Sequence, residues 1–215
     1  MKLLIFGASG RTGLELVKQA LAQQHTVTAF VRNPDTFTLQ HERLRVIKGD
    51  ITNYAEVEQA VMGQDVVLSG LGPHTLLKRI PELVLGCHNI IKAMEKQGVK
   101  RLVYESALGV GDSKADQNLF FKYVILPVLL SRDYADHEEN EQNIRNSHLD
   151  WVIVRPARLV DGPRTGKYQV ALRLPGTFPF GRVVRADTAE FMLQQIDDTE
   201  FLHATPGILG HKSIA

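Results

Sequence analysis

Hydrophobic and polar residues alternate along the chain between two kinds of segment. Short runs of consecutive apolar residues, such as Val66-Val67-Leu68 and Val152-Ile153-Val154, are followed by longer segments in which apolar residues recur every three or four positions. A continuous apolar run is typical of a strand buried on both faces, and the longer segments are typical of amphipathic helices. Because strand and helix repeat in this order, we expect an α/β fold of Rossmann type, with a doubly wound, mainly parallel sheet and helices on both faces.

The same pattern gives approximate bounds for each element. The predicted strands are Leu3–Phe6, Thr26–Val31, Arg45–Lys48, Asp65–Ser69, Arg101–Glu105 and Trp151–Val154. The predicted helices are 12–23, about 53–61, about 81–97, a long region within 115–146 that Pro127 could break, and 187–196. Residues 156–185 contain four prolines and four glycines, which predicts a loop-rich segment on the substrate side of the domain.

Length and composition narrow the class of protein. A chain of 215 residues favours one domain, and 44% apolar with 23% charged residues is typical of a soluble protein. The net charge of +1 gives no reason to expect a nucleic-acid or membrane partner. We see no targeting segment and therefore expect a cytoplasmic protein. We also expect a monomer or a weak homodimer.

Glycines concentrate between the first predicted strand and the first predicted helix, in the segment GASGRTG. Glycine allows a tight turn and a close approach of the backbone to a pyrophosphate, and the following helix N-terminus presents free N–H groups to phosphate oxygens. This context predicts a dinucleotide site and distinguishes the segment from an isolated glycine turn. The residues assigned to it are Gly7, Ser9, Gly10, Arg11, Thr12 and Gly13.

The end of the second strand predicts which dinucleotide binds. NAD enzymes place an acidic residue there to bind the ribose 2′-hydroxyl, but here the strand ends in Arg32 and the next acidic residue is Asp35. A guanidinium group binds phosphate oxygens with two parallel hydrogen bonds, so Arg32, with help from Arg11, favours NADPH. The alternative is that both arginines are merely solvated.

Further site residues follow the other strands, because ligands of such sheets bind outside the carboxyl ends of the strands. We expect Asp50 near the adenine, although it could simply begin a helix. The nicotinamide and the substrate should meet near Ser106 and Arg158. The remaining residues expected to contact the cofactor are Ile51, Leu71, Gly72 and Pro156.

Several segments together resemble the atypical short-chain dehydrogenases. These are GASGRTG, VRNP, the Gly49-Asp50 pair, Ser106 at a strand end and LDWVIVRPARLVDGPRTGKYQV. Within that family the chain is most similar to the flavin reductase and biliverdin-IXβ reductase group, which includes NmrA-like NAD(P)H-binding proteins. The resemblance implies that Ser106 is an active-site serine. It places Arg158 where the mammalian enzyme of the group has an active-site histidine.

The chain lacks the Tyr-x-x-x-Lys pair of typical short-chain dehydrogenases, since Tyr123 is followed at the fourth position by Pro127 and Tyr134 by Glu138. Reduction of a simple ketone needs an acid at the oxygen, whereas flavins and linear tetrapyrroles delocalise the added charge. We therefore expect a planar conjugated acceptor. Ser106 would hydrogen-bond the nicotinamide amide or the substrate. Arg158 would attract a flavin phosphate or a bilin propionate, unless it is simply a surface residue.

Other features indicate structural roles. His137 to Glu141 lacks the second histidine of a zinc helix, so we expect no metal and interpret this segment as a solvated acidic helix face. Cys87 should be a small buried hydrophobic residue. Leu119–Leu130 should be core, or else an apolar wall over the substrate or a subunit contact.

Two hypotheses about function remain. The first is an NADPH-dependent reductase of a flavin, a bilin or a quinone. The second is a non-catalytic NADP-binding redox sensor of the NmrA type, which would bind cofactor and a partner protein without turnover. A sugar-nucleotide epimerase is the weakest alternative, because the chain lacks the tyrosine pair and a second domain.

Overall fold

The computed structural model describes residues 1–72, 79–116, 131–174 and 181–211. Eight strands form one sheet in the order β3-β2-β1-β4-β5-β6-β10-β8, and a further pair, β7 and β9, forms a small second sheet. Within the large sheet only β8 is antiparallel to its neighbour, which is β10. The strands are β1 Lys2–Phe6, β2 Thr26–Val31, β3 Leu44–Lys48, β4 Val66–Ser69, β5 Arg101–Glu105, β6 Asp150–Pro156, β7 Arg158–Val160, β8 Tyr168–Ala171, β9 Arg182–Val184 and β10 Gly207–Gly210. The Rossmann-type α/β fold is therefore confirmed.

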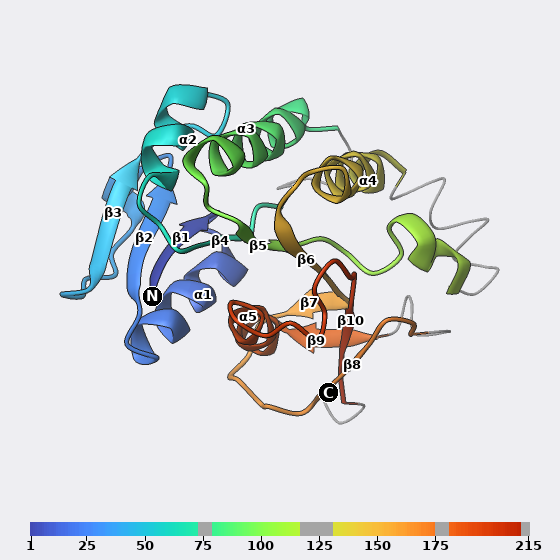
Figure 1. Cartoon of the computed structure of the whole chain (residues 1–215). Helices are drawn as coiled ribbons and strands as arrows, with labels where there is room; N and C mark the ends of the chain where they lie inside the picture. Colours follow the sequence, from blue (N-terminus) through green and yellow to red (C-terminus); the bar gives the residue numbers. More distant parts are fainter. Residues whose placement is uncertain (73–78, 117–130, 175–180, 212–215) are drawn as a thin grey trace.

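Helices cover both faces of the sheet (Figure 1). Helices α1 and α5 pack against each other on one face, while α2, α3 and α4 lie side by side on the other. The helices are α1 Arg11–Ala22, α2 Tyr54–Val61, α3 Pro81–Gln97, α4 Ser131–Arg145 and α5 Arg185–Gln194, with short 3₁₀ turns at Pro34–Thr36 and Gly111–Asp116. No helix among the described residues is long and apolar enough to cross a membrane.

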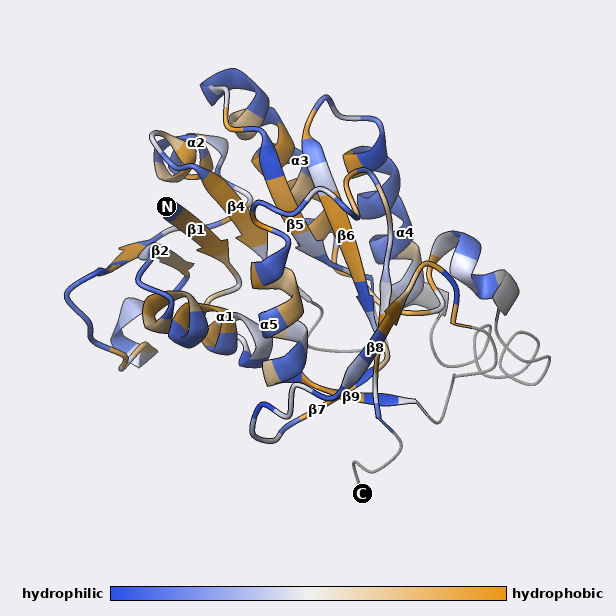
Figure 2. Ribbon diagram, turned by 60° about the horizontal axis from the view of Figure 1, so that its bottom comes forward, coloured by the Kyte–Doolittle hydropathy of each residue, from blue (hydrophilic) through white to orange (hydrophobic). Residues whose placement is uncertain are grey.

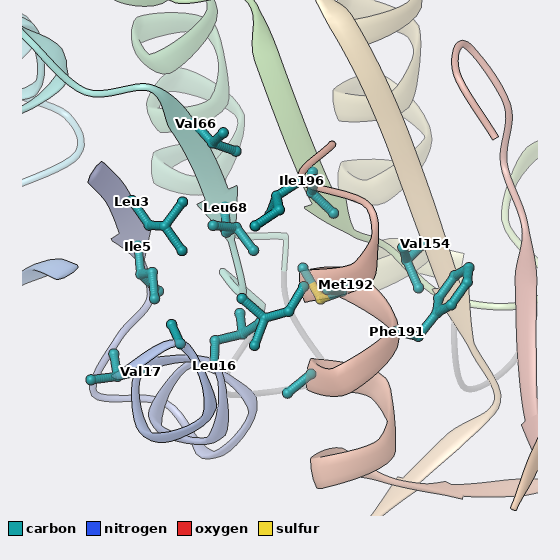
Figure 3. Packing of buried hydrophobic residues seen from close by; sticks show 14 of the residues in the cluster. Leu3, Ile5, Leu16, Val17, Val66, Leu68, Val154, Phe191, Met192 and Ile196 are labelled. Atoms are coloured by element: carbon teal, nitrogen blue, oxygen red, sulfur yellow. The ribbon is translucent and has the colours of Figure 1, made fainter. Parts of the chain in front are cut away.

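Two hydrophobic clusters join the layers. On the first face, side chains from β1 and β4 such as Ile5 and Leu68 meet Leu16 of α1 and Met192 of α5 (Figure 3). Hydrophobic residues dominate the central strands, as expected for strands buried on both faces (Figure 2). Cys87 lies in the second cluster, where burial raises the pKa of its thiol to about 12, so it is a buried hydrophobic residue as predicted.

The predicted bounds agree closely with the observed elements for the first 110 residues. The strands Thr26–Val31 and Arg101–Glu105 and the helix 81–97 match to the residue. The expected loop-rich segment 156–185 includes three short strands, β7, β8 and β9, which are too short for an alternation pattern to predict. Residues Leu119–Leu130, predicted as core or as an apolar wall, lie outside the described residues. The described C-terminal part of the predicted helical region 115–146 forms α4.

Candidate functional site

A cavity of about 930 Å³ lies along the carboxyl ends of the parallel strands. Its lining begins at the loop after β1, passes the ends of β2 and β3, and reaches the ends of β4, β5 and β6. The predicted site residues that line it are Gly7, Ser9, Gly10, Arg11, Thr12, Arg32, Asp50, Ile51, Leu71, Gly72, Ser106, Pro156 and Arg158. The fold thus brings together at one sheet edge every predicted site residue except Gly13.

The glycine loop between β1 and α1 is shaped by backbone contacts. Gly7 has a φ of +74°, and a Cβ there would lie 2.6 Å from the carbonyl oxygen of Gly70. A Cβ on Gly13 would lie 2.0 Å from the carbonyl oxygen of Gly7. Gly13 therefore does not line the cavity but lets α1 approach the loop.

The beginning of α1 has the free donors that a pyrophosphate needs. Its N-cap, Gly10, provides no side-chain cap, and the first turn holds no acidic residue. The first N–H groups of a helix have no partner within the helix, and its N-terminus has a positive partial charge. A site with uncapped donors on a loop that tolerates no Cβ at Gly7 fits the phosphates of a dinucleotide.

The arginines near the loop have different partners. Arg32 follows β2 and lines the cavity as an exposed residue. Arg11 donates to Asp161 at 3.0 Å, and Arg185 donates to the other carboxylate oxygen of Asp161 at 2.6 Å. Arg32 forms no ion pair with another described residue, whereas Arg11 would have to leave Asp161 in order to bind a phosphate.

Asp50 lies at the cavity and is held by the residues that lead into α2. It lines the cavity, and its Oδ1 also accepts hydrogen bonds from the backbone N–H and the hydroxyl of Thr52 at 2.9 and 2.8 Å. These hydrogen bonds from Thr52 lower the pKa of Asp50. The two hydrogen bonds from Thr52 thus hold the Asp50 carboxylate in place in the turn that leads to α2.

Ser106 lies directly after β5 and is 4% exposed. Its hydroxyl donates to Glu141 Oε1 of α4 at 2.6 Å. The Arg155 guanidinium of β6 donates to both oxygens of that carboxylate, at 3.0 and 2.5 Å. Only Ser106 of these three lines the cavity, so the buried ion pair lies behind it.

Comparison with known proteins identifies the kind of cofactor. A sequence profile described as NAD(P)H-binding matches residues 7–199, which is most of the chain. The chain belongs to the NAD(P)H-binding family. A nicotinamide dinucleotide is therefore confirmed as the class of cofactor, and the fold is shared with solved structures that include a short-chain dehydrogenase/reductase.

One curated protein and two solved structures are similar to this chain. A Saccharomyces cerevisiae protein, UPF0659 protein YMR090W, is 28% identical over 91% of this chain and 87% of its own length. The structure of ChuY, described as an anaerobillin reductase from Escherichia coli O157:H7, is 24% identical with a TM-score of 0.82, covering 99% of this chain and 98% of its own. A short-chain dehydrogenase/reductase from Veillonella parvula, in complex with NADP, is 21% identical with a TM-score of 0.81, covering 99% and 95%.

The structure of the segment from His137 to Glu141 differs from the solvated acidic face that was predicted for this NAD(P)H-binding protein. The expected solvated face is wrong for His137, Asn140 and Glu141, which are each less than a tenth exposed, whereas Glu139 is exposed. They follow helical spacing with Ile144, which is fully buried, so this face of α4 packs on the sheet. The spacing to Ile144 is the signal that could have revealed it.

His137 and Tyr134 are two cavity residues that the sequence interpretation missed. Burial lowers the pKa of His137, so its imidazole is neutral at physiological pH. The Tyr134 hydroxyl donates to the backbone carbonyl of Leu108 at 2.9 Å. The residue four positions later, Glu138, binds Lys114, so α4 offers no lysine beside this tyrosine.

Glu105 is a third residue that the sequence interpretation missed. It is 6% exposed, lines the cavity, and accepts a hydrogen bond from the Thr12 hydroxyl at 3.1 Å. Burial raises the pKa of Glu105 to about 7. Its position beside Ser106, at the end of a strand predicted to be buried, could have identified it, because an acidic residue is uncommon in a buried strand.

Proposed function

We propose that the protein is an NADPH-dependent reductase that transfers a hydride to a planar conjugated acceptor, a flavin or a biliverdin-type bilin. The observation that carries the proposal is the continuous cavity between the glycine loop and the pair Ser106 and Arg158. Its volume of about 930 Å³ is near the upper end for ligand pockets, which suits a cofactor together with a second ring system.

The preference for NADPH rests on Arg32. Its guanidinium follows β2, where enzymes of this fold contact the adenosine ribose, and no acidic residue occupies that strand end. The Veillonella parvula protein, which shares the fold, is described in complex with NADP. Both points favour a 2′-phosphate in this site.

The class of acceptor is inferred from the apolar lining of the cavity and from Arg158. Leu83, Leu108 and Leu159 are among the lining residues, and apolar walls suit a flat aromatic ligand. Arg158 lies exposed at the rim, where it would attract a phosphate or a propionate. ChuY, which shares the fold, is named as an anaerobillin reductase.

The chain's own groups would act mainly by alignment. When bound, NADPH supplies a hydride, which forms a new bond to the acceptor and leaves the cofactor oxidised; water supplies the proton that completes the reduction. The protein holds the two rings together in the cavity, and such positioning can account for several kcal/mol of barrier. Ser106 adds a hydrogen bond, and Arg158 binds the acidic group of the acceptor.

Steady-state oxidation of NADPH tests the proposal with FMN, riboflavin, a quinone and the biliverdin isomers side by side. We expect turnover with at least one flavin or bilin. A calorimetric titration with NADPH is run on the same preparation. If NADPH binds tightly but none of these acceptors is reduced, the reductase proposal fails and the redox-sensor hypothesis replaces it.

A further inference from the structure

The single proton of the Ser106 hydroxyl has a fixed destination in this structure. It points to Glu141 Oε1 at 2.6 Å, and both groups are almost fully buried. An ionised carboxylate only accepts hydrogen bonds, so Ser106 must be the donor in this contact. Toward the cavity, the Ser106 oxygen can therefore only accept a hydrogen bond.

Arg155 keeps this arrangement from reversing. Its guanidinium is 1% exposed and donates to both oxygens of Glu141, forming a bidentate ion pair. An arginine stays protonated, and its buried charge needs carboxylate partners. Asp112 is the second partner, at 2.7 Å from the Arg155 guanidinium, but Glu141 is the buried one. Gly111 leaves room for the pair, because a Cβ there would lie 2.8 Å from an Arg155 nitrogen.

We propose that Glu141, held by Arg155, fixes Ser106 as a hydrogen-bond acceptor that selects ligand groups carrying an N–H. This inference rests on the proposed function and specifies the chemistry of its site. Glu141 is a positioning residue, since it does not line the cavity. Ser106 consequently cannot donate to a substrate carbonyl while it bonds to Glu141, as a serine that polarises a ketone must.

Two sources can supply the N–H: the carboxamide of the nicotinamide, or a ring nitrogen of the acceptor. Matched pairs of compounds distinguish them. The 3-acetylpyridine analogue of NADP⁺ keeps the carbonyl of the carboxamide and lacks only its N–H groups. Likewise, 3-methyllumiflavin differs from lumiflavin by a methyl group in place of the N3 hydrogen.

Equilibrium binding is measured by calorimetry for the cofactor pair and by flavin fluorescence for the acceptor pair, the latter with NADP⁺ present. For one of the pairs, wild-type protein should bind the N–H compound about three- to tenfold more tightly than its partner, the worth of one neutral hydrogen bond. Ser106→Ala should reduce that ratio by a similar factor. The pair that responds identifies the source of the N–H.

Glu141→Gln tests the positioning role. Both Arg155, at 2.5 Å, and Arg145, at 3.7 Å, lie near Glu141 Oε2, so the amide oxygen should take that position. The amide N–H groups would then replace Oε1, to which Arg155 donates its longer hydrogen bond, and would face Ser106, whose hydroxyl would turn to donate into the cavity. Binding of the compound without the N–H should then strengthen about three- to tenfold, a gain that mere structural damage would not produce. Glu138→Gln is the matched control, because Glu138 lies on the same helix but binds Lys114; it should keep the wild-type ratio.

Unchanged ratios for both pairs in Ser106→Ala would overturn the proposal. So would a folded Glu141→Gln protein in which neither compound without the N–H gains affinity. If circular dichroism shows that Glu141→Gln does not fold, the comparison of wild type with Ser106→Ala decides. Because these are binding measurements, they stay decisive if the acceptor panel shows no turnover, so failure of the reductase proposal is seen separately.

Discussion

Arg32 is the residue on which the choice between two cofactors depends. It lines the cavity at the end of β2, and the carboxylate that would favour NADH is absent from that strand end. We expect Arg32→Ala to remove most of a preference for NADPH over NADH that should be at least about tenfold in the wild type. Calorimetric titration with both cofactors measures this preference.

Arg11→Ala is the matched control for this prediction. Because the Arg11 guanidinium already pairs with Asp161, its loss should reduce the preference less than loss of Arg32. Equal affinity of the wild type for the two cofactors would contradict the assignment of Arg32.

Glu105 should give the protein a characteristic dependence of stability on pH. Its pKa in the folded protein is about 7, above the ordinary 4.5, because burial disfavours the charged carboxylate. Between these values the folded state binds more protons than the unfolded state, so this contribution to stability is complete below pH 4.5 and is lost as pH rises through 7. The loss is at most about 3 kcal/mol.

Urea unfolding at pH 5 and pH 8 measures this dependence. Glu105→Gln should flatten it and should raise stability relative to wild type at the higher pH. Glu15→Gln, at a partly exposed position of α1, should keep the wild-type slope. An unchanged slope in Glu105→Gln would show that other groups cause it.

Arg158 should affect acidic acceptors selectively. It is exposed at the rim of the cavity, so its loss should remove attraction without disturbing the fold. We expect Arg158→Ala to raise KM for FMN about tenfold, the approximate worth of one charge-assisted hydrogen bond, and to change KM for riboflavin little. Steady-state kinetics with this pair isolates the phosphate, and an equal effect on both would argue against a phosphate contact.

At the scale of elements, the close approach of α1 to β1 depends on Gly13. A Cβ there would lie 2.0 Å from the carbonyl oxygen of Gly7, which is backbone and cannot rotate away. Gly13→Ala should therefore destabilise the protein by about 1–3 kcal/mol, the usual cost of overpacking. Gly72→Ala is the control, because a Cβ at Gly72 meets nothing within 4 Å.

The midpoint of thermal unfolding should fall for the first variant and stay near wild type for the second. Equal midpoints for both variants would mean that α1 can shift without cost.

Helix α4 shows why some site residues could not be predicted. The acidic residues between His137 and Glu141 indicated a solvated helix face. Tertiary structure decides otherwise, because Glu141 pairs, together with Asp112, with the buried guanidinium of Arg155 on β6. A pairing between residues 14 positions apart on different elements leaves no periodic signal. The glycine loop, in contrast, is local, and its role could be read directly.

At the scale of the whole molecule, the parallel part of the sheet was predictable and its far edge was not. Continuous apolar runs such as Val152-Ile153-Val154 mark strands that are buried on both faces. Strand β10, Gly-Ile-Leu-Gly, is too short to show a pattern, yet it joins β6 to β8. The ends of the six strands that were predicted from the sequence therefore indicated where the cavity lies. The positions of β7 to β10 depend on contacts with the finished sheet and could not be predicted in this way.

Ile208 of β10 should be important for the stability of the whole sheet. It is fully buried, and it pairs with Pro156 of β6 on one side and Val170 of β8 on the other. We expect Ile208→Ala to cost about 2–5 kcal/mol, as for other fully buried aliphatic residues. Urea unfolding measures the change, and Leu209→Ala, at a partly exposed neighbouring position, should cost clearly less. Equal costs would show that β10 is peripheral.

The position of β10 also bears on how the chain folds during synthesis. This strand is almost the last described segment of the chain, yet it lies inside the sheet between β6 and β8. Until residue 210 has left the ribosome, the growing chain has β6 as an open strand edge with unpaired N–H and carbonyl groups, which are prone to aggregation. The wait should matter most when translation is slow, and a chaperone that shields strand edges would then raise the yield of folded protein.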